Sequence, residues 1–333
     1  MTPSRREVLK RAGATASVAT VGTAGSVTVA AQETADDELP AYSRWLTIDD
    51  GGLEFAYVDW ARLDEYVQGE LEEADPDEEV PAEYEADPMI APVSEGALST
   101  YFFVGLNLAP FRLGRLLDDD DAFESTVSEL LQTPEAFVVI GSIAPAEIDT
   151  RLTAEPEADF VRQLEPTTEI GEYDVYTPVD GDDAAIAVGS DALVVVSEAD
   201  DPVPILETTI GAATGGGERA TDASEAFAWA VSSAGAGDVA VGQSGPEAGT
   251  PDDDGGLVDF GYEELADAES IVSSLSVRDE ETSTGEFAAV IDDPDEAALE
   301  SLLGASGEQQ SVDVDGDRVA ATALWREREL TEE

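Results

Sequence analysis

Short apolar runs rich in Val, Ile, Ala and Phe recur along the chain and predict β-strands. The clearest runs are at residues 53–58, 137–143, 192–197, 238–241 and 287–291. Residues 44–49 precede the first run, and Asp-Gly-Gly at 50–52 separates the two segments. A Gly-containing turn between two alternating segments is typical of a β-hairpin. The sequence therefore predicts a hairpin over residues 44–58.

Other segments carry apolar residues at the spacing of a helix. They start at Trp60, with Leu63, Tyr66, Val67 and Leu71 on one face, and recur at 118–130, 202–213, 223–233 and 295–303. Residues 101–117 are apolar around Pro110 and fit either a helix or a strand. Strands that return through hairpins, with helices between them, favour an α+β fold. We expect antiparallel sheets with the helices packed on one face.

Changes in composition divide the chain into regions. Residues 32–42 form a polar spacer, and 43–242 form an α+β region. Within that region, residues 72–95 are acidic and rich in proline, which predicts a long surface loop. A loop dense in Gly, Pro and Asp follows at 243–262, and residues 263–328 form a C-terminal β-β-α-β-β unit.

A strand–helix–hairpin unit is repeated weakly along the chain. FVVIGSI at 137–143 precedes a helical pattern and then the turn Val-Asp-Gly-Asp at 179–182. FAAVI at 287–291 precedes a second helical pattern and the same four residues at 314–317. The sequence thus predicts an internal duplication in which these two turns are equivalent.

The charge balance indicates the solvent to which the protein is adapted. Asp and Glu number 76 against 15 Lys and Arg, a formal net charge of -61, while 42% hydrophobic residues suffice for a core. Carboxylates repel one another over about 10 Å at 0.1 M salt but only about 3 Å at 1 M. The composition resembles that of proteins from salt-accumulating haloarchaea. It predicts hydrated salt cations as partners and disfavours nucleic acid and anionic membrane surfaces, which repel such a chain.

The N-terminus concentrates positive charge. Ser-Arg-Arg-Glu-Val-Leu-Lys at 4–10 resembles the twin-arginine export motif, with Arg5 and Arg6 as its arginine pair. An uncharged stretch, 12–31, follows and ends in Val-Ala-Ala, which predicts cleavage after Ala31. The resemblance implies that residues 1–31 are a signal peptide that engages the twin-arginine translocation machinery. Export to the envelope or the medium is then expected, with an uncleaved membrane anchor as the alternative.

Removal of the signal peptide would also change the chemistry available to the chain. Four basic residues and one acidic residue lie in 1–31, so 11 basic and 75 acidic residues would remain, with a formal charge of -64 and no lysine.

Two further stretches resemble a family of bacterial envelope proteins that share a domain of unknown function. They are VVVSEADDPVPIL at 194–206 and DASEAFAWAVSSAGAGDVAVG at 222–242. The resemblance covers less than half of the chain and implies no activity and no catalytic residues.

The absence of residue types excludes several reaction classes. The chain contains neither His nor Cys, and its single lysine is Lys10 in the predicted signal peptide. Catalysis by Ser-His-Asp, Cys-His, Ser-Lys or a lysine imine is therefore excluded in the mature chain, as are thiol redox chemistry and typical zinc sites. We expect no cofactor. A pair of carboxylates, as in glycosidases, stays allowed, but the sequence does not select the pair.

Two aspartate runs are candidate sites for a hard cation. They are Asp118, Asp119, Asp120 and Asp121, and Asp252, Asp253 and Asp254. Aspartates at a helix start or on the surface of an acidic chain are the alternative. The run Val-Asp-Val-Asp-Gly-Asp at 312–317 has the initial spacing of a calcium loop but lacks its closing Glu, so a hairpin turn explains it better.

A Gly-Gly-Gly stretch at 215–217 precedes a helical segment but has neither the lysine nor the spacing of a phosphate loop. Asp222 and Glu225, which follow this stretch, have the spacing of a helix capping pair. Trp60, Trp229 and Trp325 lie in periodic segments and are predicted in the core.

Taken together, the sequence predicts an exported, salt-adapted α+β protein that acts as a non-catalytic binding or surface-associated module. An extracellular hydrolase with two carboxylates and a cation-binding surface protein are the alternatives.

The charge density predicts that folding depends on salt. We expect the protein to lose its cooperative unfolding transition on dialysis from molar salt into dilute buffer, because carboxylate repulsion is then unscreened. Thermal melting followed by circular dichroism measures this. A melting curve that does not respond to salt would contradict the prediction.

Overall fold

A computed structural model of the chain describes residues 39–49, 51–63, 82–118, 122–156, 158, 160–246, 248–250, 256–279 and 282–326. The predicted signal peptide and most of the predicted spacer lie outside these residues.

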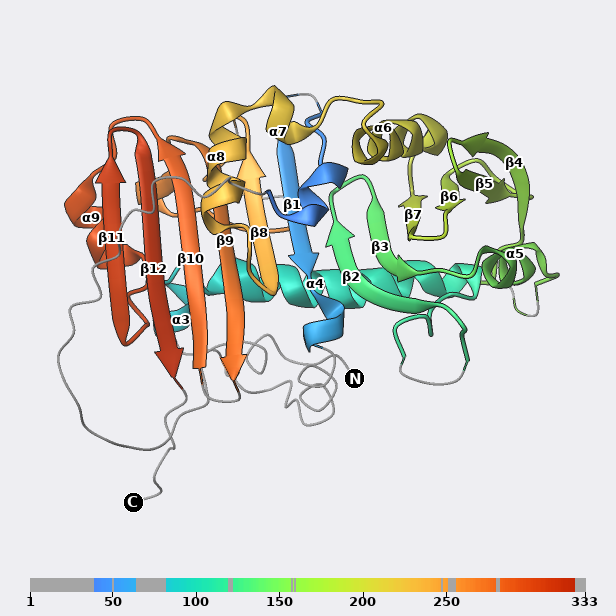
Figure 1. Ribbon diagram of the computed structural model, residues 1–333, viewed down its shortest axis with the longest axis horizontal. Coiled ribbons are helices and arrows are strands. Elements are labelled where there is room, and N and C mark those ends of the chain that lie inside the picture. The colour runs from blue at the N-terminus through green and yellow to red at the C-terminus, as the bar shows by residue number, and fades with distance from the viewer. Residues whose placement is uncertain are drawn as a thin grey trace, which may run out of the picture.

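One continuous antiparallel sheet dominates the fold (Figure 1). In the described part of the chain it contains 12 strands in the order β11-β12-β10-β9-β8-β1-β2-β3-β7-β6-β5-β4. The strands are β1 (Leu53–Val58), β2 (Thr126–Gln132), β3 (Phe137–Ser142), β4 (Leu164–Ile170), β5 (Tyr173–Pro178), β6 (Ala184–Val188), β7 (Ala192–Ser197), β8 (Val239–Ser244), β9 (Ala268–Asp279), β10 (Thr282–Ile291), β11 (Gln309–Asp315) and β12 (Arg318–Arg326). The predicted α+β class with antiparallel pairing is confirmed.

Helices cover both faces of this sheet rather than one. One face carries η1 (Ala41–Trp45), α6 (Pro202–Thr214), α7 (Ala220–Ala223) and α8 (Glu225–Ala234), whose buried residues form one hydrophobic cluster. The other face carries α4 (Ala91–Leu108), α5 (Pro145–Thr153) and α9 (Glu296–Leu302) over a second cluster. The remaining short helices are α3 (Ala82–Glu85), η2 (Ala109–Phe111) and η3 (Glu263–Leu265). Two apolar faces must both be buried, which explains why the prediction of helices on a single face is wrong.

Strand β1 lies in the middle of the sheet between β8 and β2. Its six residues pair with 239–244 in β8, and Ala56, Tyr57 and Val58 also pair with β2. The predicted hairpin over 44–58 is therefore wrong in its first strand. Arg44 lies in η1, and only the isolated bridge between Asp49 and Gly52 joins the two segments.

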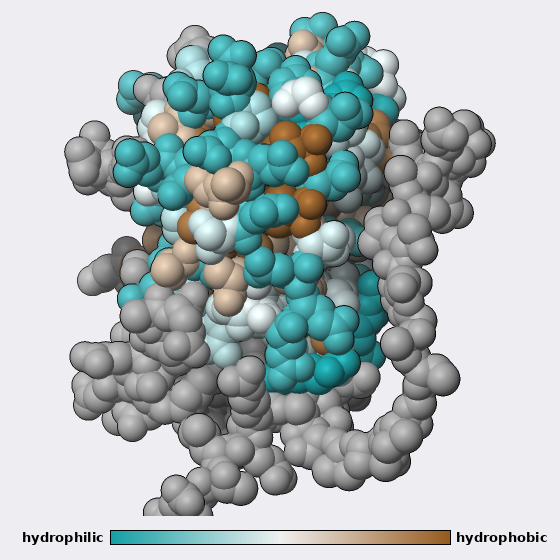
Figure 2. All heavy atoms as spheres, turned by 90° about the vertical axis from the view of Figure 1, so that its left-hand side faces the viewer, coloured by the Kyte–Doolittle hydropathy of each residue, from teal (hydrophilic) through white to brown (hydrophobic). Residues whose placement is uncertain are grey.

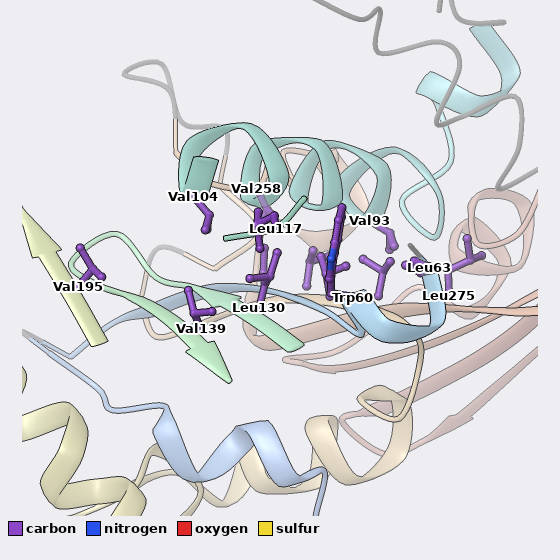
Figure 3. Packing of buried hydrophobic residues seen from close by; sticks show 14 of the residues in the cluster. Trp60, Leu63, Val93, Val104, Leu117, Leu130, Val139, Val195, Val258 and Leu275 are labelled. Carbon is purple, nitrogen blue, oxygen red and sulfur yellow. The ribbon is translucent and has the colours of Figure 1, made fainter. Parts of the chain in front are cut away.

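Helix α4 crosses the sheet near its centre (Figures 1 and 3). Val93 and Val104 of α4 point toward the strands, where Leu130 and Val139 are buried beneath the helix (Figure 3). Gly96 permits this close approach, because a Cβ atom at Gly96 would lie 2.4 Å from Val241 Cγ1. The uncharged stretch after residue 95 thus forms the central helix on this face of the sheet.

Two sequence predictions near α4 are wrong. The predicted surface loop 72–95 contains α3 and the start of α4, and Met89 and Ile90 within it are fully buried; its first ten residues lie outside the described ones. The helix expected over 118–130 is the strand β2 from Thr126 onward. In the first case the segment is buried against the sheet, and in the second the neighbouring strands pair with it. A local sequence pattern reveals neither contact.

The predicted C-terminal segment contains β9, β10, α9, β11 and β12, and it continues the same sheet as the preceding residues. The predicted loop 243–262 begins in β8, and its later residues Val258 and Phe260 are buried beside α4 and the sheet.

The sheet order repeats in its two halves, β1-β2-β3-β7-β6 and β8-β9-β10-β12-β11. In this order, the hairpin β6–β7 occupies the place of β11–β12. The turn at Gly181, however, joins β5 to β6, whereas the turn at Gly316 joins β11 to β12. The two turns predicted as equivalent therefore occupy different places, and the predicted duplication is not confirmed.

Two glycines of α4 provide a matched test of this packing. We expect Gly96→Ala to lower the free energy of unfolding by about 1–3 kcal/mol, because its Cβ overlaps Val241. We expect Gly105→Ala to raise it by about 0.5–1 kcal/mol, because no atom lies within 4 Å of the new Cβ and alanine favours the helix. Thermal or chemical unfolding in molar salt measures both, and equal effects of the two changes would contradict the packing described.

Candidate ligand-binding cleft

A cleft of about 700 Å³ lies where the first residues of β1, the last residues of β8 and the β2–β3 turn meet. These elements approach one another in the upper part of Figure 1. The lining residues are Thr47, Asp49, Gly52, Leu53, Glu54, Thr133, Pro134, Glu135, Gln243, Ser244, Pro246, Ala248 and Thr250. Its volume falls in the range of small-molecule sites in proteins.

A smaller hollow of about 220 Å³ adjoins this cleft on the side of α6. It shares Thr47, Asp49 and Glu135 with the larger one and adds Ile48, Pro204, Ile205, Thr208 and Thr209. The two hollows together form a groove from α6 across the η1–β1 connection to the segment after β8. The two carboxylates on their common wall, Asp49 and Glu135, are both exposed.

The groove is rich in hydrogen-bond acceptors. Threonine and serine hydroxyls, the Gln243 amide and three carboxylates line it, and none of the described lining residues is basic or aromatic. Hydroxyl, amide and ammonium groups donate to such acceptors, whereas an anion would meet only like charge. Without an aromatic platform, the groove would hold a ligand by hydrogen bonds rather than by stacking.

Glu54 and Gln243 hold the floor of the cleft in place. Glu54 accepts hydrogen bonds from the backbone N–H groups of Leu257 and Val258, both at 3.0 Å. Gln243 Nε2 donates to Glu54 Oε1 at 3.1 Å, and Gln243 Oε1 accepts from Gly249 N at 3.2 Å. Both oxygens of Glu54 are therefore engaged in fixing the segment that follows β8. We assign Glu54 a structural role.

Of the predicted cation residues, the structure describes only Asp118, which pairs with Arg115 at 3.1 Å and does not line this groove. The others, Asp119, Asp120, Asp121, Asp252, Asp253 and Asp254, lie outside the described residues. Within the part of the chain that the structure describes, no group of three or more acidic side chains is arranged to hold a metal ion.

The turn interpretation of the Asp-Gly motifs is confirmed. Gly316, at a φ of 69°, lies in the loop that joins β11 to β12, and Gly181, at 102°, lies between β5 and β6. Asp183 of the second turn pairs with Arg162, and this partner lowers the pKa of its carboxyl group.

The Gly-Gly-Gly stretch terminates a helix and does not form a phosphate-binding loop. Gly215 terminates α6 in the left-handed conformation, and the N–H groups of Gly216 and Gly217 both donate to Gly211 O. The capping pair predicted at Asp222 and Glu225 is wrong. Ser224 caps α8 and accepts from Phe227 N at 3.1 Å, because α7 and α8 meet at that serine.

The tryptophan prediction holds for two of the three side chains. Trp60 and Trp325 are buried, whereas Trp229 is partly buried beneath the Arg318 guanidinium, 5.1 Å from its ring centre.

A second carboxylate group lies at the opposite end of β1. Asp238 is 3% exposed, pairs with Arg62 at 2.7 Å and accepts from Val277 N at 2.8 Å. Burial raises the pKa of Asp59, and the charge of Asp238 raises it further, against the opposing effects of Arg62. Burial likewise raises the pKa of Glu129 above its ordinary 4.5, with a further rise from Asp59; Tyr57 and Arg44 lower it by less.

Sequence reasoning missed the groove because its residues come from distant segments. Leu53 and Ser244 face each other only through the pairing of β1 with β8, and Glu135 reaches the groove through the β2–β3 turn. Thr133-Pro134-Glu135 reads as an ordinary turn in the sequence, and no local signal marks it as part of a site.

The raised pKa of Glu129 predicts a pH effect on stability. A folded-state pKa above the unfolded value contributes stability that is full below pH 4.5 and is lost as the pH rises through the folded pKa. We expect Glu129→Gln to weaken this loss, so that its melting temperature declines less than that of the parent between pH 4.5 and neutrality. Glu165→Gln, at an exposed position of β4, is the control. Parallel pH curves for the parent and Glu129→Gln would refute the prediction.

No helix among the described residues has the length and apolar character needed to cross a bilayer.

Comparisons with known proteins give no family for this chain. No family model and no curated protein matches it. Crystal form III of TP0453 is similar with a TM-score of 0.42 and 10% identity, covering 87% of this chain and 95% of that chain. Crystal form I of TP0453 is similar with a TM-score of 0.45 and 9% identity, covering 87% and 94%. Similarity at this level assigns no function, and the resemblance to a bacterial envelope family stays a prediction.

Proposed function

We propose that this protein is an exported, salt-adapted, non-catalytic binding module, and that the groove beside β1 is its ligand site. The ligand class that fits is a small polar molecule rich in hydrogen-bond donors. Saccharides and other polyols supply such donors as hydroxyl groups, and amines supply them as ammonium groups.

The lining of the groove carries this proposal. Asp49 and Glu135 stand on the wall common to both hollows, with Thr47 beside them and Thr208 and Thr209 on the α6 side. The described lining residues supply many acceptors, and none of them is basic. The volume matches a ligand of drug or oligosaccharide size.

The chemistry of the groove supports binding rather than catalysis. Glu54 is occupied by Leu257 N, Val258 N and Gln243, so it is not placed to act as an acid or base on a ligand. The carboxylates with raised pKa values, Asp59, Glu129 and Glu286, do not line the groove, and the first two lie at the other end of β1.

A hydrolase that uses two carboxylates is the second candidate. One observation favours it, because Asp49 and Glu135 both border the cleft and the hollow that adjoins it. Two carboxylates on either side of a bound glycoside are the requirement of that chemistry.

Export and salt adaptation complete the proposal. The twin-arginine-like leader supports translocation out of the cytoplasm, and the excess of carboxylates supports a folded state maintained in brine.

Ligand titration in molar KCl tests the site. We expect saturable binding of a member of one of two panels, neutral saccharides or polyamines, detected by calorimetry and by a rise in melting temperature. Saturation at 100 times the dissociation constant would stabilise the fold by about 2.7 kcal/mol. The double variant Asp49→Asn, Glu135→Gln should weaken this binding about tenfold or more, because two charge-assisted hydrogen bonds are lost.

Glu165→Gln, on the exposed edge strand β4, is the matched control and should bind as the parent does. Binding that survives the double variant would place the ligand elsewhere, and the failure of both panels would refute the proposal. Cleavage of a bound glycoside by the parent, abolished in the double variant, would establish the hydrolase instead.

A further inference from the structure

Within the described residues, the sheet ends in two edge strands, β4 on one side and β11 on the other. An edge strand presents a row of backbone N–H and C=O groups that can pair with another strand. Proteins usually block such edges with proline, charge or a bulge. The two edges of this sheet differ in proline content and in register, although each carries two exposed acidic residues.

Strand β4 is blocked. Pro166 lies within it, and its register with β5 shifts between Pro166 and Thr168. Glu165 and Glu169 are exposed on the same strand. A proline and an irregular register together prevent continuous pairing at this edge.

Strand β11 is not blocked in this way. Its seven residues pair with β12 without a register shift, and it contains neither proline nor glycine. Figure 2 views the molecule from this side and shows hydrophobic residues among hydrophilic ones. The apolar residues of β11, Val312 and Val314, are only partly buried.

The turn after β11 fixes which backbone groups face outward. Asp315 pairs with Arg318, so the loop contains two residues, and Gly316 takes a positive φ. The residues that flank a two-residue hairpin loop form a hydrogen-bonded pair, and such pairs recur at every second residue. Asp315, Asp313 and Ser311 therefore bond to β12. The N–H and C=O groups of Gln310, Val312 and Val314 point away from it.

The charge along β11 is asymmetric. Its first half, Gln309-Gln310-Ser311, is neutral, and its second half carries Asp313 and Asp315. When two copies of such a strand pair antiparallel about Val312, each acidic residue faces a neutral one. Asp313 then lies opposite Ser311, and Asp315 opposite Gln309. The outward groups of Val312 face each other, as the alternation of the hydrogen bonds requires.

We propose that β11 pairs with β11 of a second copy of this chain, which joins the two sheets into one across a twofold axis. The contact is isologous, so each residue pair occurs twice in the dimer, except the Val312–Val312 pair on the axis. The charge pattern of β11 favours a second copy as the partner. Antiparallel pairing of two copies over all seven residues places each acidic residue opposite a neutral one. Salt screening permits two such acidic molecules to approach. An interface of one strand pair is small, and the dimer is expected to be weak and concentration-dependent.

Opposite charges at one position provide the test. Ser311 is exposed and lies opposite Asp313 of the second copy in the proposed register. We expect Ser311→Lys to lower the dimer dissociation constant about fivefold and Ser311→Asp to raise it about fivefold, because each change creates two cross-strand charge pairs. Sedimentation equilibrium in molar KCl measures the constant, and circular dichroism verifies that both variants fold.

Thr168→Asp on the exposed β4 edge is the matched control and should leave the dissociation constant unchanged. The cysteine-free chain also allows Val312→Cys to be joined to its counterpart by a short bismaleimide, with Thr168→Cys as the comparison. A parent that stays monomeric at all concentrations would overturn the proposal. So would shifts of the same sign for the two Ser311 variants, or cross-linking as efficient at residue 168 as at residue 312.

Discussion

The pairing of β1 with β8 holds the architecture together. Six residues of β1 lie beside six of β8, although residues 59–238 separate the two strands in sequence. Strand β1 also pairs with β2 on its other side. The strands before and after this joint would otherwise form two separate sheets. Both helical layers depend on it, because α4 crosses β1 on one face, while Phe55 of β1 contacts Phe227 of α8 on the other at a ring distance of 6.0 Å. The groove depends on it too, since its floor is the junction of β1 and β8.

Several carboxylates join separate segments of this chain by accepting backbone hydrogen bonds, and basic residues are few. Asp87 is fully buried and accepts hydrogen bonds from Met89 N, Gly304 N and Ser306 N, which ties the segment before α4 to the loop after α9. Glu54 fixes the segment after β8 in the same manner. Because backbone N–H groups replace Lys and Arg as partners, an acidic chain can bury carboxylates without many ion pairs.

Glu147 is a third member of this set and shows its consequence for titration. Burial raises the pKa of Glu147, but hydrogen bonds from Glu124 N, Ser125 N and the Ser125 hydroxyl, together with Arg151, outweigh this effect. The pKa therefore lies below the usual range. The carboxylates that join segments and those exposed on the surface thus belong to the same residue types. Their difference lies in whether backbone groups converge on the side chain.

Local pattern in the sequence determined the strong strands, the helices at α6, α8 and α9, the Asp-Gly turns and the α+β class, because periodicity and turn chemistry act over a few residues. Composition alone excluded histidine and cysteine chemistry and left Lys10 as the single lysine. Only the tertiary structure decided that residues 126–132 form a strand, that residues 91–95 start the central helix, and that helices cover both faces. The groove belongs to this second class, because Asp49, Glu135 and Gln243 become neighbours only after β1 has found β2 and β8, and long-range pairing leaves no mark in a short stretch of sequence.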